Sequence, residues 1–172
     1  VIKEDAFRGC NFVSVTIPNS VTNIGNYAFY DCSKLTSVTI PNSITKIGEN
    51  AFNNCTSLES VVIPNSVANI GERAFASCRS LTSAVIGAGN MEEDAFQDCT
   101  SLTNVIMEYG VTSIGRDAFY RCTSLKSVAI PSSVTNIGNT AFYCCTSLTN
   151  ATIESGVMSI GIGAFYDCTS LK

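Results

Sequence analysis

The dipeptide Ala-Phe recurs at nearly constant intervals along the chain, and this repetition limits the possible folds more than any other feature of the sequence. The intervals between its phenylalanines are 22, 23, 23, 21, 23, 23 and 23 residues. A cysteine follows each phenylalanine by three positions. The phenylalanines are Phe7, Phe29, Phe52, Phe75, Phe96, Phe119, Phe142 and Phe165.

Regular units of this length are typical of a solenoid, in which each repeat buries its apolar side only by stacking on its neighbours. We therefore expect residues 1–172 to form one domain without a linker. A partial unit at 1–11 precedes seven repeats, which run 12–34, 35–57, 58–80, 81–101, 102–124, 125–147 and 148–170. Repeat 81–101 is two residues short, because Gly-Ala-Gly-Asn from Gly87 replaces a longer turn.

The first half of each repeat has the pattern of a strand. Val38 and Ile40 alternate with polar residues, as in a strand with one buried face. Pro41 then ends the strand, because proline cannot donate to a sheet ladder. Ile44 and Ile47 are placed to point inward again, which indicates a second short strand.

The second half of each repeat favours a helical turn. Residues 49–54 have the composition of a short helix that carries Ala51, Phe52 and Cys55 onto the core. A 3₁₀ turn is the alternative. A continuous stack of phenylalanine rings should run through the interior.

The full pattern Leu-x-x-Val-x-Ile-Pro-x-x-Val-x-x-Ile-Gly-x-x-Ala-Phe-x-x-Cys resembles the BspA-like, or Treponema pallidum type, leucine-rich repeat. The resemblance covers essentially all 172 residues. It implies a right-handed, curved superhelix with a parallel β-sheet on its concave side. Together with the expected helical turns, this predicts an α/β solenoid. Members of the family are mostly secreted or surface proteins of bacteria and some protists, implicated in adhesion and protein binding.

One position departs from the general leucine-rich repeat. That repeat places Asn or Cys three residues after the last apolar residue of the strand. In this sequence serine usually occupies that position. The column of asparagines found in the general leucine-rich repeat should therefore be absent or replaced. The serines are Ser20, Ser43, Ser66 and Ser133.

Composition and charge exclude several classes of function. The net charge is −4 with only ten basic residues, which argues against a nucleic-acid partner. No apolar run approaches the roughly 20 residues of a membrane-spanning helix. The chain opens at Val1 without a signal peptide or lipidation motif, as a processed or excised piece would.

The nine cysteines do not predict an active or metal site. Zinc needs clustered ligands, often with histidine, but the chain has no histidine and about one cysteine per repeat. A catalytic thiolate needs a base or a positive environment. Stacked cysteines with parallel side chains are poorly placed for disulfides. We therefore expect buried, unbridged thiols, no cofactor, and one exposed thiol at Cys144, which lies outside the column.

Positions that vary while the scaffold repeats are the best candidates for function. The residues that flank the inward valine of each strand should point out from the concave face. In one such column four consecutive repeats carry apolar residues, and these should form a binding patch. A neighbouring column would supply hydrogen bonds at its rim. The apolar residues are Val62, Val85, Ile106 and Ala129, and the rim residues are Ser60, Ser83 and Asn104.

Tyrosines offer an extension of this patch and an alternative to it. Tyr109 should lie at the sheet edge near Ile106 and extend the concave patch. Tyr120, Tyr143 and Tyr166 follow the phenylalanine column and would form an aromatic strip for a protein or glycan. The same strip would also simply shield the phenylalanines from water.

These observations predict a non-enzymatic, secreted or cell-surface module that binds a protein or glycoprotein. The alternative is a structural unit that self-associates through uncapped ends, because neither end has the polar capping repeat of a typical solenoid. A small hydrolase is a remote third reading, since the chain has no histidine and no expected cleft.

Overall fold

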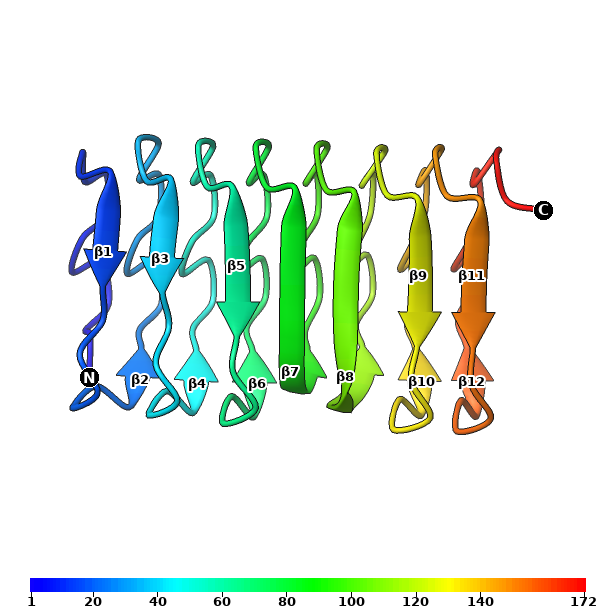
Figure 1. Ribbon diagram of the computed structural model, residues 1–172, viewed down its shortest axis with the longest axis horizontal. Coiled ribbons are helices and arrows are strands. Elements are labelled where there is room, and N and C mark those ends of the chain that lie inside the picture. The colour runs from blue at the N-terminus through cyan, green and yellow to red at the C-terminus, as the bar shows by residue number, and fades with distance from the viewer.

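The computed structural model describes residues 1–172 as a parallel β-solenoid, in which each coil lies beside the next (Figure 1). Equivalent residues such as Ser14 and Ser37 pair across neighbouring coils. The long-strand face carries β1 (Ser14–Thr16), β3 (Ser37–Thr39), β5 (Ser60–Ile63), β7 (Ser83–Met91), β8 (Asn104–Ile114), β9 (Ser127–Ile130) and β11 (Asn150–Ile153). The opposite face carries β2 (Asn23–Ile24), β4 (Lys46–Ile47), β6 (Asn69–Ile70), β10 (Asn136–Ile137) and β12 (Ser159–Ile160).

All strand pairs are parallel, because each coil adds its strands in the same direction as the coil before it. On the long-strand face, β5, β7, β8, β9 and β11 are hydrogen-bonded in sequence order, and β1 pairs with β3. On the opposite face the ends of β7 and β8 join the short strands. The row of coils is nearly straight in Figure 1.

β7 and β8 are much longer than the other strands, and neither coil has the proline that follows the strand in four of the other coils. Gly87 and Glu108 stand where other coils have Pro41, Pro64 and Pro131. Each of the two strands continues around the bend, with register shifts between Ile86 and Ala88 and between Gly89 and Asn90. The shortened turn expected in repeat 81–101 is thus a continuous strand.

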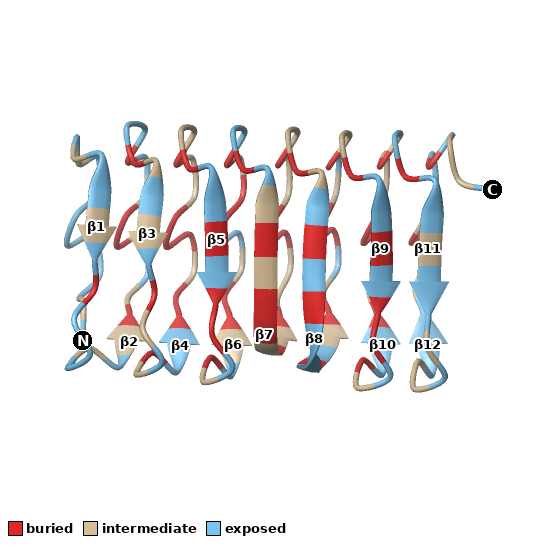
Figure 2. Cartoon of the chain, viewed as in Figure 1, coloured by how far each residue is buried: buried red, intermediate tan, exposed pale blue.

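The core follows the alternation expected for these strands. In β5 the buried residues Val61 and Ile63 alternate with the exposed Ser60 and Val62, as the banding in Figure 2 shows. A single cluster of 46 buried hydrophobic residues runs through the solenoid. The rings of Phe29, Phe52 and Phe75 stack with centroids 4.9 and 5.1 Å apart, so the expected phenylalanine column is confirmed.

The prediction of helical turns is wrong, because the chain forms no helix. It follows that no helix of this chain could cross a membrane. The solenoid is all-β rather than α/β. Residues 49–54 form turns in which backbone amides alternate between two kinds of partner. Asn53 donates within the coil to Asn50, whereas Phe52 donates to Ala74 of the next coil at 2.7 Å.

Two left-handed residues explain why this segment does not become helical. Asn50 and Asn54 have φ angles of 53° and 61°, and equivalent positive angles recur in the other coils. A right-handed helix cannot continue through such residues. A helix would also point its amides along its own axis, and the hydrogen bonds from Asn50, Phe52 and Asn54 to the next coil would be lost.

The predicted change in the asparagine ladder takes a definite form. The Ser43 hydroxyl donates to the carbonyl of Val21 at 2.6 Å, and the Ser66 hydroxyl donates to the carbonyl of Ile44 at 2.7 Å. Serine thus replaces asparagine by bonding the backbone of the preceding coil. The Ser133 hydroxyl is buried but has no hydrogen-bond partner.

Candidate binding surface

The predicted apolar column lies on the long-strand face. Val62 pairs with Val85 and Val85 with Ile106, so these three side chains are direct neighbours across β5, β7 and β8. The exposed fractions of Val62 and Ile106 are 59% and 48%, and Val85 is half-buried. Ala129 on β9 is exposed too. The alternating inward residues Val61, Val105 and Val128 are buried.

The polar column beside it also points outward. Ser83 pairs with both Ser60 and Asn104. Ser60 and Asn104 are exposed, and Ser83 is half-buried. The structure therefore brings together the apolar and rim residues selected from the sequence.

A hollow of about 310 Å³ adjoins the apolar column. It lies where β7 passes the bend without the turn that other coils have, so the turn of the preceding coil and Glu108 of the next coil form its walls. Gly87 lies between them, and a Cβ atom there would come within 2.7 Å of the Asn65 backbone nitrogen. The lining includes Val62, Pro64, Asn65, Val85, Gly87 and Glu108.

One side chain in the lining of this hollow hydrogen-bonds two other lining residues. The Asn65 amide, in the orientation that satisfies both its nitrogen and its oxygen, donates to Oε2 of Glu108 at 2.8 Å and to the Gly87 carbonyl at 3.2 Å. Glu108 makes no ion pair. Sequence reasoning did not select Glu108 or Asn65. The replacement of proline by glutamate at position 108 was the available signal.

Tyr109 projects from the end of the same bend. Its exposed fraction is 71%, and its hydroxyl donates to Oε1 of Glu154 at 3.4 Å. Oε2 of Glu154 accepts the Ser132 backbone amide at 2.9 Å. Tyr109 therefore extends towards the C-terminal coils, and like Ile106 it lies on β8.

The tyrosine strip forms a second exposed surface. The Tyr120 and Tyr143 rings stack at 5.0 Å, and the Tyr143 and Tyr166 rings stack at 5.5 Å. Tyr120 and Tyr143 are half-buried, whereas Tyr166 is 65% exposed. The strip is well ordered by stacking, but no hollow adjoins it.

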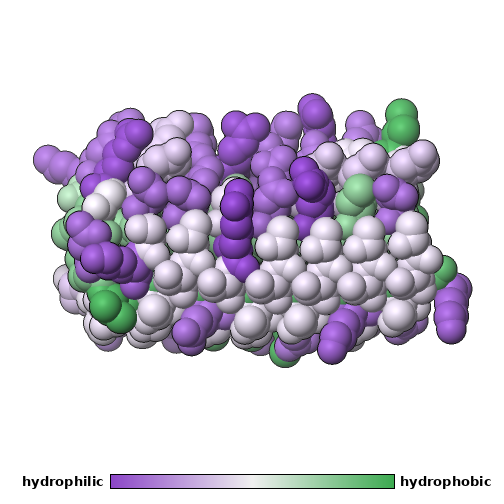
Figure 3. Space-filling model, turned by 90° about the horizontal axis from the view of Figure 1, so that it is seen from above, coloured by the Kyte–Doolittle hydropathy of each residue, from purple (hydrophilic) through white to green (hydrophobic).

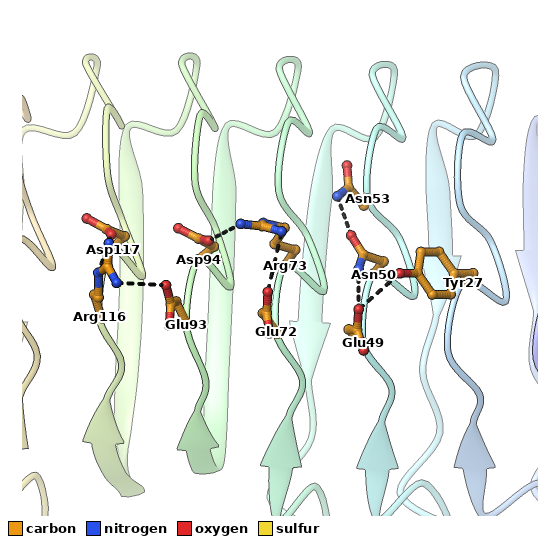
Figure 4. Close-up of polar contacts among 10 residues, drawn as sticks. All are labelled: Tyr27, Glu49, Asn50, Asn53, Glu72, Arg73, Glu93, Asp94, Arg116 and Asp117. Atoms are coloured by element: carbon orange, nitrogen blue, oxygen red, sulfur yellow. Dashed lines mark hydrogen bonds and ion pairs between the residues drawn. The ribbon is translucent and has the colours of Figure 1, made fainter.

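Charged side chains form a ladder near the left-handed turns (Figure 4). Arg73 contacts Asp94 at 2.9 Å and Glu72 at 3.4 Å. Arg116 contacts Asp117 at 3.0 Å and Glu93 at 3.4 Å. Every charged side chain in this ladder has an oppositely charged neighbour. The ladder therefore holds neighbouring coils together through the pairs Arg73–Asp94 and Arg116–Glu93.

Asp94 is the most buried member of this ladder. Its burial raises the pKa of its carboxyl, and the nearby Arg73 guanidinium opposes that rise. The corresponding position in an earlier coil is Asn50, which donates to Glu49 and accepts from Asn53, while Tyr27 also donates to Glu49 (Figure 4). A neutral amide at the same place indicates a structural role for the position.

The cysteine column makes a hydrogen-bond ladder that the sequence did not predict. The Cys78 thiol donates to the carbonyl of Phe52 at 3.2 Å, and the Cys99 thiol donates to that of Phe75 at 3.2 Å. All nine cysteines are free. Burial raises the pKa of Cys78 to about 12 and raises that of Cys99 well above its ordinary value. No group of three or more His, Cys, Asp or Glu side chains could hold a metal ion.

The edge of the solenoid above the cysteine turns offers no apolar patch of comparable extent. Figure 3 shows this edge covered mainly by hydrophilic and small neutral residues, with strongly hydrophobic atoms chiefly towards the ends. Outside the first and last coils, the exposed large hydrophobic side chains are those of Val62, Ile106 and Tyr109.

Comparison with solved structures supports the architecture. A crystal structure of a leucine-rich-repeat protein of Treponema pallidum shares 30% identity and a TM-score of 0.86, over 93% of this chain and 78% of that chain. A leucine-rich cell-surface protein of Faecalibacterium prausnitzii shares 27% identity and a TM-score of 0.61. This second match covers 99% of this chain but 61% of that one.

A leucine-rich-repeat protein of Bacteroides ovatus shares 28% identity and a TM-score of 0.50, with 98% of this chain and 62% of that chain covered. The chain thus spans about three fifths of the length of two of these relatives. No curated protein sequence matches it. The family model described as the BspA-type leucine-rich-repeat region matches residues 1–92 and 89–172, with six copies of the repeat, and the chain therefore belongs to the BspA-type leucine-rich-repeat family.

Proposed function

We propose that residues 1–172 form one non-enzymatic binding domain, which contacts a protein or glycoprotein partner through its long-strand face. The observation that carries this proposal is the contiguous apolar column of Val62, Val85 and Ile106, which stays exposed beside a hollow. The family consists generally of protein-interaction modules. A secreted or cell-surface location is part of the proposal, supported by the name of the Faecalibacterium prausnitzii relative.

The energetics favour this surface for binding. Burial of apolar area contributes roughly 25 cal/mol per Å², so Val62 and Ile106 would each contribute about 1 kcal/mol or more on contact. Ser60 and Asn104 lie beside them as hydrogen-bonding groups at the rim. This combination of an apolar centre and a polar rim is typical of protein interfaces.

A double substitution tests the proposal. Replacing Val85→Asp and Ile106→Asp should abolish capture of a specific protein from extracts of host surface proteins and matrix, with folding retained because both positions face outward. The matched control is Thr16→Asp with Thr39→Asp, which lie in the same column outside the patch. Mass spectrometry would identify the captured proteins. If no protein distinguishes the patch variant from the control, the long-strand face is not the binding surface.

The same assay tests the tyrosine strip as the alternative surface. Replacing Tyr143→Ser and Tyr166→Ser should leave capture unchanged if the long-strand face binds. Selective loss in this variant would transfer the function to the strip.

Self-association is a second candidate function, favoured by the exposed apolar residues of the last coil. Met158 and Ile162 are 87% and 84% exposed, and Ile160 is 53% exposed. Stacking of another copy on this coil would bury them and extend the sheet. We expect the sedimentation coefficient of residues 1–172 to rise with concentration, and Met158→Glu with Ile162→Glu to abolish that rise. A parent chain that sediments as a monomer at all concentrations would contradict this second function.

A further inference from the structure

We propose that the hollow beside Glu108 receives a lysine side chain of the protein partner. This inference rests on the proposed function and specifies one feature of the partner. The hollow adjoins the apolar column rather than lying apart from it, because Val62 and Val85 line both. A partner seated on the long-strand face would therefore cover the mouth of the hollow.

The lining suits a side chain with an apolar stem and a polar end. Val62, Pro64 and Val85 supply apolar contacts, and Asn42, Asn65 and Glu108 supply polar groups. Lysine buries its methylene stem along apolar surface while its ammonium group seeks water or an acceptor. The ammonium would lie against the Glu108 carboxylate.

Charge around the hollow favours a cation. Glu108 has no basic partner in the protein. Glu108 and Glu154 are the only charged residues in the segments that connect the two strand faces, and no lysine or arginine occurs there. These segments are 17–22, 40–45, 64–68, 87–89, 108–112, 131–135 and 154–158.

The state of the carboxylate favours lysine over arginine. Asn65 already donates to Oε2 of Glu108, which leaves Oε1 as the free oxygen. The arginine fork binds best to two carboxylate oxygens at once. Lysine presents a compact point charge that one oxygen can satisfy.

Titration of short peptides tests this assignment directly. The probe is the blocked peptide Ala-Ala-Lys-Ala-Ala, and its counterparts carry norleucine or arginine in place of lysine. NMR would follow the amide resonances of the ¹⁵N-labelled protein during each titration. A methyl glycoside, titrated in the same way, serves as a neutral sugar control. We expect the lysine peptide to shift the resonances of Asn65, Gly87 and Glu108 in a saturable manner, with weaker responses to arginine and none to norleucine or sugar.

A matched pair of variants isolates the carboxylate. Glu108→Gln keeps the shape and can still accept from Asn65, but it removes the charge, so the lysine peptide should bind at least about threefold more weakly. Glu154→Gln, at the equivalent position two coils on and outside the hollow, should leave binding unchanged. Raising the salt concentration should weaken binding to the parent. Absence of saturable binding, equal binding by Glu108→Gln, or preference for norleucine, arginine or sugar would overturn the proposal.

Capture of the partner separates this inference from the proposed function. If Val85→Asp with Ile106→Asp loses the captured protein while Glu108→Gln retains it fully, the binding face stands and the lysine site is overturned. If the parent binds the lysine peptide as expected but the patch variant captures the same proteins as the parent, the lysine site stands and the proposed face is overturned.

Discussion

Ser66 and Ser133 occupy the same position of the repeat, but only Ser66 has a hydrogen-bond partner. The coil before Ser133 has no proline turn, since β8 continues as a strand through Val111. The regular acceptor geometry of the other coils is therefore absent there. Two serines at the same position of the repeat can therefore differ in how much they stabilise the fold, because the backbone of the preceding coil differs.

We expect Ser66→Ala to lower the free energy of unfolding by about 1 kcal/mol, because a partly buried hydrogen bond to the Ile44 carbonyl is lost. Ser133→Ala should leave stability unchanged or raise it, because it removes a buried hydroxyl without a partner. Urea unfolding of both variants would measure the difference. Equal losses of stability in the two variants would contradict this account.

Residue positions with strong periodicity could be predicted from the sequence. Phe75 and Cys78 lie in the core as expected, because apolar columns repeat in every coil and each must face the same interior. The thiol hydrogen bond of Cys78 could not be predicted, because it depends on a carbonyl of the preceding coil. Cys144 was recognised as outside the column, and its φ angle of 56° shows that its position requires the left-handed conformation.

The turns after the short strands are the elements that sequence reasoning assigned wrongly. Six residues with helix-compatible composition do not distinguish one turn of helix from two consecutive turns that each contain one residue with a positive φ angle. The signal was present in the column that contains Asn54, whose equivalents include Gly9, Asp31, Asp98 and Asp167. Glycine, asparagine and aspartate are the residues that tolerate positive φ angles.

Thr140 is the least suitable residue for such a turn. Its φ angle is 52°, and a β-branched side chain is strongly disfavoured there. We expect Thr140→Asn, which copies Asn50 of an earlier coil, to raise the free energy of unfolding by about 1 kcal/mol. The control Thr22→Asn, at an exposed position without a positive φ angle, should change stability by less than about 0.5 kcal/mol. A destabilised Thr140→Asn variant in thermal unfolding would contradict the argument.

The hollow is an element-scale feature that only the structure reveals. The sequence showed that repeat 81–101 is two residues short, but its consequence depends on the turns on either side. Because Pro64–Asn65 and Glu108 remain in place beside the shortened bend, a space opens between them. The apolar column itself was predicted, because alternation within a strand fixes which side chains face outward.

Across the whole molecule, the cysteines divide into two classes by accessibility. Seven are buried and make thiol hydrogen bonds to backbone carbonyls, whereas Cys10 and Cys144 are half-buried near the surface. We expect a thiol reagent to modify at most these two in the native protein, and all nine after denaturation without reductant. Reaction should be slow even at Cys144, because its partial burial and its contact with Asp167 raise its pKa. Rapid native modification of four or more thiols would contradict the structure.

The buried thiols should also make the solenoid less stable in alkali. Burial raises the pKa of Cys78 from its ordinary value of 9.0 to about 12 in the folded chain. Since the folded pKa is higher, the stabilisation from a neutral Cys78 is fully present below about pH 9. It is lost as the pH rises towards 12, because the unfolded chain ionises first.

Comparison of the parent with Cys78→Ala isolates this contribution from the tyrosines and lysines, which titrate in both proteins. The difference in free energy of unfolding between them should narrow by about 2–3 kcal/mol between pH 8 and pH 11, at up to 1.36 kcal/mol per pH unit. Urea unfolding at each pH would measure it. The control Val61→Ala truncates a buried side chain that has no titratable group, so its difference from the parent should stay constant. A constant difference for Cys78→Ala as well would show that the buried thiol does not ionise on unfolding in this range.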